Sequence, residues 1–170
     1  DVQMKNVNGK EDTAFTVQYD FCMPERFDLN YTGEDGAKHR AFVIHRSSIG
    51  TFERTMAFLI EKYAGAFPVW LAPVQVKVLP ISEKHQAYAQ KVFETLKTEN
   101  IRAEIDLSNE TLGKKIRAAK SQKIPYLLII GDKEVTDNQV TVEDSSGTKG
   151  QTSTLDNFLT KISEEIKNRA

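Results

Sequence analysis

The sequence predicts two different folds in one chain: an α+β part, with an antiparallel sheet and one helix, over residues 1–70, and an α/β domain over residues 71–170. Larger apolar residues alternate with polar ones in residues 15–21 and again in residues 26–32, and apolar residues then recur at helical spacing from residue 52 to residue 63. After residue 73, strand-like and helix-like stretches alternate, which favours a mostly parallel sheet. A hydrophobic content of 39% in 170 residues suffices for a buried core and argues against a disordered chain.

Two alternating runs, a turn and a further apolar run indicate consecutive antiparallel strands between residues 14 and 46. Residues 15–21 alternate larger apolar and polar side chains, as a half-buried strand does, and residues 26–32 alternate again. Residues 33–36, Gly-Glu-Asp-Gly, tolerate the positive φ of a hairpin turn. We therefore expect residues 41–46 to return as the partner strand.

One helix is expected after these strands, between Gly50 at its start and Gly65 at its end. Residues 68–73 form a connector that begins and ends with proline, and because proline restricts φ this connector is stiff. We place the domain boundary there, near residue 71. The apolar face of the helix consists of Phe52, Met56, Leu59, Ile60 and Tyr63.

The second half predicts strands and helices in the order β-α-β-α-β-β-α. The first strand ends at Pro80, and the amphipathic helix after it carries Ala87, Val92 and Leu96 among its apolar positions. Residues 126–130 are a continuous apolar run, as expected for a strand covered on both faces. The full set of predicted elements is strand 74–78, helix 83–98, strand 101–107, basic helix 110–123, strand 126–130, strand 140–142 and helix 155–166.

Composition excludes several classes of protein. The net charge is −1, with −2 on residues 1–70 and +1 on residues 71–170, so any nucleic-acid contact has to come from a local patch. No run approaches the roughly 18–20 apolar residues of a membrane span. The N-terminus has neither a signal sequence nor an initiator Met, so we expect an excised piece of a longer chain.

The isolated cysteine and two of the histidines are expected to be inert. Cys22 is the only cysteine, which suits a reducing cytoplasm, and we expect it to be an unreactive strand thiol. His39 and His85 are expected on the surface. Trp70 is expected to pin the connector as an aromatic anchor.

Two stretches could carry chemistry, each with a plainer alternative. The sequence Gly50-Thr51-x-x-Arg54 begins a helix, where free N–H groups favour anions, but it could equally be a capped helix whose Arg54 pairs with Glu53 or Glu61. His45 could bind a metal or could be an ordinary hydrogen-bonded histidine. The cluster Lys114, Lys115, Arg117, Lys120 and Lys123 could bind RNA or could be a solvated helix face.

Several longer motifs resemble the threonyl-tRNA synthetase family, whose members are class II aminoacyl-tRNA synthetases. The match runs in order along essentially the whole chain. The motifs that carry it are Pro24-Glu25-Arg26-Phe27-Asp28-Leu29-x-Tyr31, Gly33-Glu34-Asp35-Gly36, His45-Arg46, Gly50-Thr51-x-Glu53-Arg54, Tyr63-Ala64-Gly65-x-Phe67-Pro68-x-Trp70-Leu71-Ala72-Pro73-Val74-Gln75, Asn109-Glu110, Gly113-x-Lys115-Ile116-Arg117, Lys123-Ile124-Pro125-Tyr126 and Gly131-Asp132-Lys133-Glu134-Val135.

This resemblance implies that residues 1–70 are the end of a catalytic core, with motif 3 at residues 50–54, and that residues 71–170 are an anticodon-binding domain. It implies that Arg54 is catalytic and contacts Mg-ATP, which is a substrate, and that Gln18 and Thr51 also bind substrates. His45 matches a ligand of a zinc ion that holds the amino and hydroxyl groups of L-threonine. We expect Arg54 and His45 to face one cleft.

For the second half, the resemblance implies contacts with tRNA-Thr. The residues implied are Asn109, Lys115, Arg117, Lys120 and Glu134, of which Glu134 matches a position that reads anticodon bases. Two places depart from the family pattern: Glu143 stands where an arginine is usual, and in residues 12–16 only Thr16 agrees with the usual Trp-Gln-x-Gly-Thr.

The function implied for the parent protein is a cytoplasmic, homodimeric threonine–tRNA ligase. The fragment alone is not expected to be active, because motifs 1 and 2 and two zinc ligands would lie before Asp1. The alternatives are a non-catalytic tRNA-binding module on the same fold and a sister synthetase of the same subclass, which His45 disfavours.

Overall fold

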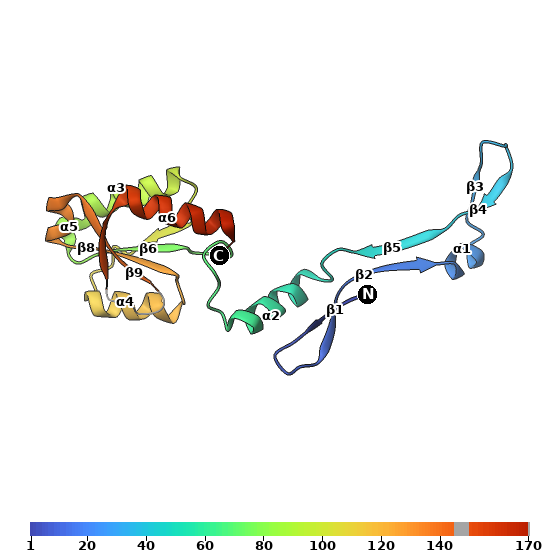
Figure 1. The fold of residues 1–170 in the computed structure, drawn as a ribbon, viewed down its shortest axis with the longest axis horizontal. Coiled ribbons are helices and arrows are strands. Elements are labelled where there is room, and N and C mark those ends of the chain that lie inside the picture. Colours follow the sequence, from blue (N-terminus) through green and yellow to red (C-terminus); the bar gives the residue numbers. More distant parts are fainter. Residues whose placement is uncertain (145–149, 170) are drawn as a thin grey trace. The chain divides into compact units, whose positions relative to one another are not determined.

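The computed structural model describes residues 1–144 and 150–169, and these fall into two compact units, residues 1–64 and residues 65–170 (Figure 1). The first unit contains a three-stranded antiparallel sheet in the order β1-β2-β5, a separate β3–β4 hairpin and two helices. Its elements are β1 (Val2–Lys5), β2 (Glu11–Asp20), α1 (Cys22–Arg26), β3 (Asn30–Thr32), β4 (Lys38–Arg40), β5 (Val43–Ser47) and α2 (Phe52–Tyr63).

The strand pairing in this unit differs from the prediction. Residues 26–32 are not one strand, because α1 ends at Arg26 and Asp28 has a positive φ of 49° before β3 begins. The turn at residues 33–36 was predicted correctly, but the strand that returns from it is β4. The predicted partner, β5, pairs instead with β2, in a register that places His45 opposite Gln18. Alternation alone cannot distinguish these pairings, because it marks a strand and not its neighbour.

The apolar side chains of the first unit are largely exposed. Pro24 is its one buried residue, although a half-buried strand was predicted at residues 15–21. The helix predicted between Gly50 and Gly65 is present as α2, and yet none of its residues is buried. The exposed apolar side chains include Phe15, Val17, Tyr19, Phe21, Phe42, Phe52, Met56 and Ile60.

The second unit is an α/β domain built on one mixed five-stranded sheet in the order β10-β9-β8-β6-β7. Strands β7 and β8 run parallel to β6, whereas β9 and β10 are antiparallel to their neighbours. The elements are β6 (Val76–Pro80), a 3₁₀ turn (Glu83–His85), α3 (Gln86–Thr98), β7 (Ala103–Ile105), α4 (Leu112–Ser121), β8 (Tyr126–Ile130), α5 (Asp132–Asp137), β9 (Gln139–Asp144), β10 (Gln151–Thr154) and α6 (Leu155–Asn168).

Two apolar clusters lie on opposite faces of this sheet. The larger joins the sheet to α3 and α6 and includes Val76, Leu128, Phe158 and Ile162, all of them buried. The smaller joins it to α4 and includes Leu127. Figure 1 shows the same arrangement, with α4 on one side of the sheet and α3 and α6 on the other. The α/β fold class predicted for this half is confirmed, but the prediction of a mostly parallel sheet was wrong, because β8–β9 and β9–β10 pair antiparallel.

Some details of the second unit were not predicted. Short helix α5 and strand β10 were both missed; they are too short and too polar to give a periodic signal. The prediction that Ala87 is an apolar contact of its helix was wrong, because Ala87 is exposed and Ala89 is buried in its place. Strand β7 is shorter than residues 101–107, and Leu107 is exposed.

The connector before β6 is held to the second unit by a buried amide. The side chain of Gln75 is fully buried; its Nε2 donates to the Val69 carbonyl at 2.8 Å, and its Oε1 accepts from the Arg102 N–H at 2.9 Å. The Arg102 guanidinium donates in turn to the carbonyls of Ala72 and Trp70 at 2.9 and 2.8 Å. A hydrophilic side chain thus satisfies backbone groups that the turning chain cannot pair with the sheet.

We predict that Gln75→Ala lowers the free energy of unfolding by about 2–4 kcal/mol, because it leaves the Val69 carbonyl and the Arg102 N–H unpaired in a buried place. Urea denaturation measures the loss. Gln90→Ala is the control, because the Gln90 amide bonds only an exposed Glu94 side chain. Equal losses for the two variants would contradict this account.

Candidate functional site

Helix α4 carries four of the five cations that the sequence singled out, Lys123 follows the helix, and the structure separates the four. Lys115 is only 4% exposed, and its ammonium donates to the carbonyls of Pro80 and Asp106 at 3.2 and 3.1 Å. Those carbonyls lie at the ends of β6 and β7, so Lys115 ties α4 to the sheet. The expectation that Lys115 faces RNA does not fit this position, because its charge is turned into the domain.

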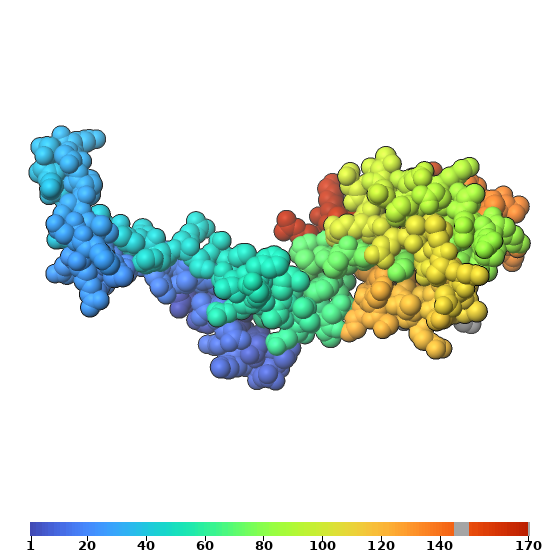
Figure 2. All heavy atoms as spheres, turned by 180° about the vertical axis from the view of Figure 1, so that it is seen from behind, coloured from blue at the N-terminus to red at the C-terminus, as the bar shows by residue number. Residues whose placement is uncertain are grey.

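The other cations of α4 are exposed, and α4 lines the surface of the second unit (Figure 2, yellow to orange). Lys114 pairs with Glu110 at 2.6 Å, and Lys120 pairs with Glu143 on β9. Arg117 forms no ion pair with any residue that the structure describes. The exposed face of α4 is therefore less positive than the sequence indicates, and Arg117 is its most available cation.

Glu134 lies beside this face, at the start of α5. Its carboxylate accepts from the Gly131 N–H at 2.8 Å and from the Thr141 hydroxyl at 2.7 Å. Burial alone would raise the pKa of Glu134, but the hydrogen bonds from Thr141 and Gly131 outweigh it and lower this pKa below its ordinary value. Glu134 is therefore a fixed, ionised acceptor at neutral pH.

Topology brings Asn109 and Glu134 to the same edge of the sheet, because β7 and β8 are both parallel to β6 and their carboxyl ends meet there. Asn109 is exposed in the loop between β7 and α4. Glu143 lies opposite Leu127, whose side chain packs beneath α4, so Glu143 is on the α4 side of the sheet. This α4 side, from Asn109 to Glu143, is the candidate nucleic-acid interface.

His85 was expected on the surface, and that expectation was wrong. The imidazole is 3% exposed; its Nδ1 faces the Ser82 N–H and hydroxyl, and its Nε2 lies 3.1 Å from Asp132. It links the loop after β6 to the loop after β8, at the edge where Glu134 lies. The sequence offered no signal for this role, because the two loops are far apart in the chain.

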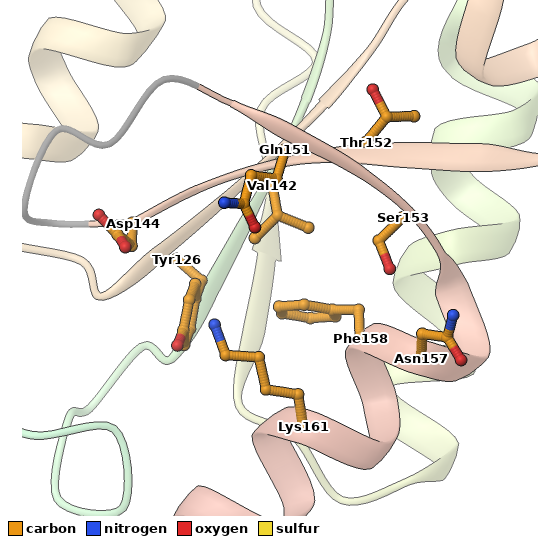
Figure 3. A pocket seen from close by; sticks show the side chains of 9 residues that line it. All are labelled: Tyr126, Val142, Asp144, Gln151, Thr152, Ser153, Asn157, Phe158 and Lys161. Carbon is orange, nitrogen blue, oxygen red and sulfur yellow. The ribbon is translucent and has the colours of Figure 1, made fainter.

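One hollow lies at the opposite edge of the sheet and holds none of the predicted site residues. It has a volume of about 440 Å³ and opens where β8 begins. Figure 3 shows Lys161 directed at the Tyr126 ring, with Phe158 beside it, and the Lys161 ammonium lies 5.1 Å from the ring centroid. The Tyr126 hydroxyl donates to Glu165 at 2.8 Å. Two polar groups of this hollow, the Tyr126 hydroxyl and the Lys161 ammonium, therefore already have partners.

In the first unit, the loop from Gly50 to Arg54 has the expected helix-start geometry. Gly50 has a φ of +65°, and a side chain there would crowd the Ala14 carbonyl, which accounts for the glycine. The Thr51 hydroxyl accepts from the Arg54 N–H at 3.2 Å and so caps α2. Arg54 is exposed and, among the described residues, pairs with neither Glu53 nor Glu61. The capped-helix alternative therefore holds for Thr51, while the guanidinium stays available.

Gln18, Asp20 and His45 share one face of the β2–β5 pair. Gln18 is directly opposite His45, and the His45 Nε2 lies 2.9 Å from Asp20 Oδ2. The N–H of Met23, followed by His45, lowers the pKa of Asp20 below its ordinary value. Cys22, expected in a strand, is instead the first residue of α1 and is exposed.

Arg54 and His45 do not line a common cleft in this chain. Arg54 borders a hollow of about 130 Å³ between α2 and the start of β2, whereas His45 borders a separate one with Gln18. Within the part of the chain that the structure describes, no three His, Cys, Asp or Glu side chains gather to hold a metal ion. His45 nonetheless suits one position of a zinc site, because a carboxylate anchors one of its nitrogens.

Comparisons with known proteins decide the family. The family described as "Anticodon binding domain" matches residues 75–165. The chain belongs to this family. The match covers the whole sheet of the second unit, from the residue before β6 to α6, and includes the α4 side described above.

Similar proteins extend the likeness beyond this domain. The threonine–tRNA ligase of Clostridium botulinum (strain Eklund 17B / Type B) is 51% identical over 166 residues, which is 98% of this chain and 26% of that protein. That of Halalkalibacterium halodurans is 52% identical over 168 residues, with the same coverage. The chain thus spans about a quarter of these relatives, and the resemblance to threonyl-tRNA synthetase is confirmed.

Solved structures agree. The RNA binding domain of threonyl-tRNA synthetase from Cryptosporidium parvum Iowa II superposes with a TM-score of 0.80 at 33% identity, over 95% of this chain and 41% of that one. Prolyl-tRNA synthetase of the same organism shares the fold, with a TM-score of 0.74 at 20% identity over 94% of this chain and 35% of that one. No helix within residues 1–144 and 150–169 is long and apolar enough to cross a bilayer.

We expect Lys115→Ala to reduce the free energy of unfolding of this anticodon-binding domain by about 2–4 kcal/mol, because the buried Pro80 carbonyl and the half-buried Asp106 carbonyl lose their donor. Lys114→Ala, one residue away on the exposed face, should change it by less than about 0.5 kcal/mol. Chemical denaturation monitored by circular dichroism compares the two variants. An unchanged stability for Lys115→Ala would refute the anchoring role.

A second prediction concerns Glu134. Thr141→Val removes the hydroxyl that donates to its carboxylate, so the pKa of Glu134 should rise towards or above its ordinary value of 4.5. A carboxylate whose pKa is lowered by folding adds to the free energy of unfolding at pH values above its unfolded pKa, and this addition is lost as the pH falls below 4.5. The free energy of unfolding of Thr141→Val should therefore fall less on acidification than that of the unaltered protein. NMR titration of the Glu134 carboxyl measures the shift, with Thr160→Val as control, because the Thr160 hydroxyl donates only to the Asp156 carbonyl among the described residues.

Proposed function

We propose that the intact protein is a threonine–tRNA ligase, which uses ATP to activate L-threonine and transfers it to tRNA-Thr. The observation that carries this proposal is identity of about half over nearly the whole chain to proteins named threonine–tRNA ligase. We assign residues 1–70 to the end of the catalytic core and residues 71–170 to anticodon binding. The proposal includes a homodimeric parent that works in the cytoplasm.

In this proposal, Arg54 contacts ATP and stabilises the charge that builds up on the phosphates as the adenylate forms. Its exposed guanidinium, at the start of α2, is free to make that contact. Thr51 and Gln18 bind substrate, and His45 is one ligand of a zinc ion. Bound zinc would supply a Lewis acid that coordinates the amino and hydroxyl groups of threonine, and so would reject isosteric valine.

For tRNA, we propose that Asn109, Arg117, Lys120 and Glu134 form the contact surface. Arg117 pairs with a phosphate of the tRNA. Lys120 also pairs with a phosphate, once its ammonium has left Glu143. The ionised Glu134 accepts hydrogen bonds from the N–H edge of an unpaired base, the kind of contact through which single-stranded loops are read. Lys115 is left out of this surface because its ammonium is bound inside the domain.

Aminoacylation of tRNA-Thr by the intact protein tests the proposed reaction. Charging should require both ATP and threonine, and Arg54→Ala should lower kcat/KM by about 100- to 1000-fold, as removal of one charge-stabilising donor does. Lys62→Ala is the control, because Lys62 is an exposed cation in the last turn of α2, outside the motif at residues 50–54. Failure of the unaltered protein to charge any tRNA would overturn the proposal.

Arg117→Ala should weaken binding of tRNA and reduce the slope of log K against log salt by about 1, because one phosphate contact is lost. Filter binding over a range of salt concentrations measures both quantities. Lys167→Ala removes an exposed cation from α6, on the other face of the sheet, and should leave the slope unchanged. Equal slopes for Arg117→Ala and the unaltered protein would exclude this contact.

A second candidate function is a non-catalytic tRNA-binding module on the same fold. The segment before Gln18 departs from the family pattern, and Glu143 replaces an arginine and engages Lys120. Threonine-dependent exchange between ATP and pyrophosphate separates the two: a ligase catalyses it without tRNA, and a binding module does not.

A further inference from the structure

The contact between Asp20 and His45 differs from an ordinary surface ion pair, because the carboxylate is locked on both sides. Asp20 Oδ1 accepts from the N–H groups of Cys22 and Met23 at 2.9 and 3.0 Å. Oδ2 lies 2.9 Å from His45 Nε2. The Asp20 side chain is 17% exposed, although His45 itself is 58% exposed. The start of α1 therefore holds the carboxylate in a fixed orientation towards the imidazole.

This geometry selects one form of the neutral imidazole. An ionised carboxylate only accepts hydrogen bonds, so His45 must carry its proton on Nε2 and leave the lone pair on Nδ1. Among the described residues, Nδ1 has no hydrogen-bond partner. His45 therefore presents an oriented, uncommitted nitrogen, the state in which histidine binds a metal ion.

The remaining residues around His45 leave much of the imidazole exposed. The imidazole borders a hollow of about 330 Å³ together with Gln18, Asp20 and Cys22. Gln18 is directly opposite His45 in the β2–β5 register, so both side chains are on the same face of the strand pair. A proposed substrate-binding residue and a proposed metal ligand are thus adjacent.

We propose that Asp20 is the positioning residue of the metal site: it fixes the tautomer and the ring orientation of His45 so that Nδ1 binds zinc. This inference rests on the proposed zinc role of His45 and adds a residue that neither the motifs nor the comparisons assign. Carboxylates in this position commonly change metal affinity by about 10- to 100-fold.

The chain contains a matched control for this idea. His39 and Asp35 form another carboxylate–histidine contact, with Nε2 2.9 Å from Oδ2, but within the β3–β4 hairpin. Asp35 also accepts a backbone N–H, from Ala37. The two pairs are chemically alike, so substitutions in them perturb net charge and local hydrogen bonding to a similar degree.

The test is the zinc affinity of the intact protein, measured by competition with a chromogenic chelator. Asp20→Asn keeps an oxygen for the N–H groups of α1 but cannot accept from Nε2–H, so its zinc Kd should rise about 10- to 100-fold. Asp35→Asn should leave the Kd unchanged. Asp20→Ser, which also keeps an oxygen at the start of α1, replaces Asp20→Asn if that variant does not fold.

His45→Ala separates failure of this inference from failure of the proposed function. If His45→Ala weakens zinc binding and Asp20→Asn does not, the positioning role is wrong and the metal role stands. If His45→Ala has no effect, the metal role itself is wrong and Asp20 has no ligand to position. Recovery of most of the affinity in Asp20→Glu, which restores a carboxylate, would support the inference further.

Discussion

The second unit depends on one constraint: the connector at residues 68–73 must turn into β6 while its buried backbone N–H and C=O groups keep hydrogen-bond partners. Gln75 meets this constraint from a fully buried position, with its amide shared between the connector and the segment before β7. Arg102 completes the network from outside. With these bonds made, β6 starts in a defined place, and β7 and β8 pair with it in parallel.

Parallel pairing then creates the candidate interface. Because the carboxyl ends of β6, β7 and β8 lie at one edge, Asn109, Glu134 and α4 come together although they are separate in sequence. The same arrangement withdraws Lys115 from the surface, since its ammonium caps the ends of β6 and β7. The buried Lys115 thus anchors α4, the helix that also carries the exposed Arg117.

The first unit follows a different logic. We propose that its motifs belong to a catalytic site. In this unit Thr51 caps α2, Arg54 forms no ion pair with a described residue, and Asp20 contacts His45. Its apolar faces nevertheless remain exposed, and Arg54 and His45 line separate hollows. These parts do not enclose one cleft, and the chain spans about a quarter of the length of its relatives.

The sequence by itself determined the family, the two fold classes and most helices and strands, because periodicity and long motifs are local properties of the chain. Only the tertiary structure decided that β5 pairs with β2, that His85 and Lys115 are buried, and that Glu143 engages Lys120. Each of these depends on which residues distant in sequence become neighbours. A charged or polar side chain looks the same in sequence whether it faces solvent or a buried carbonyl.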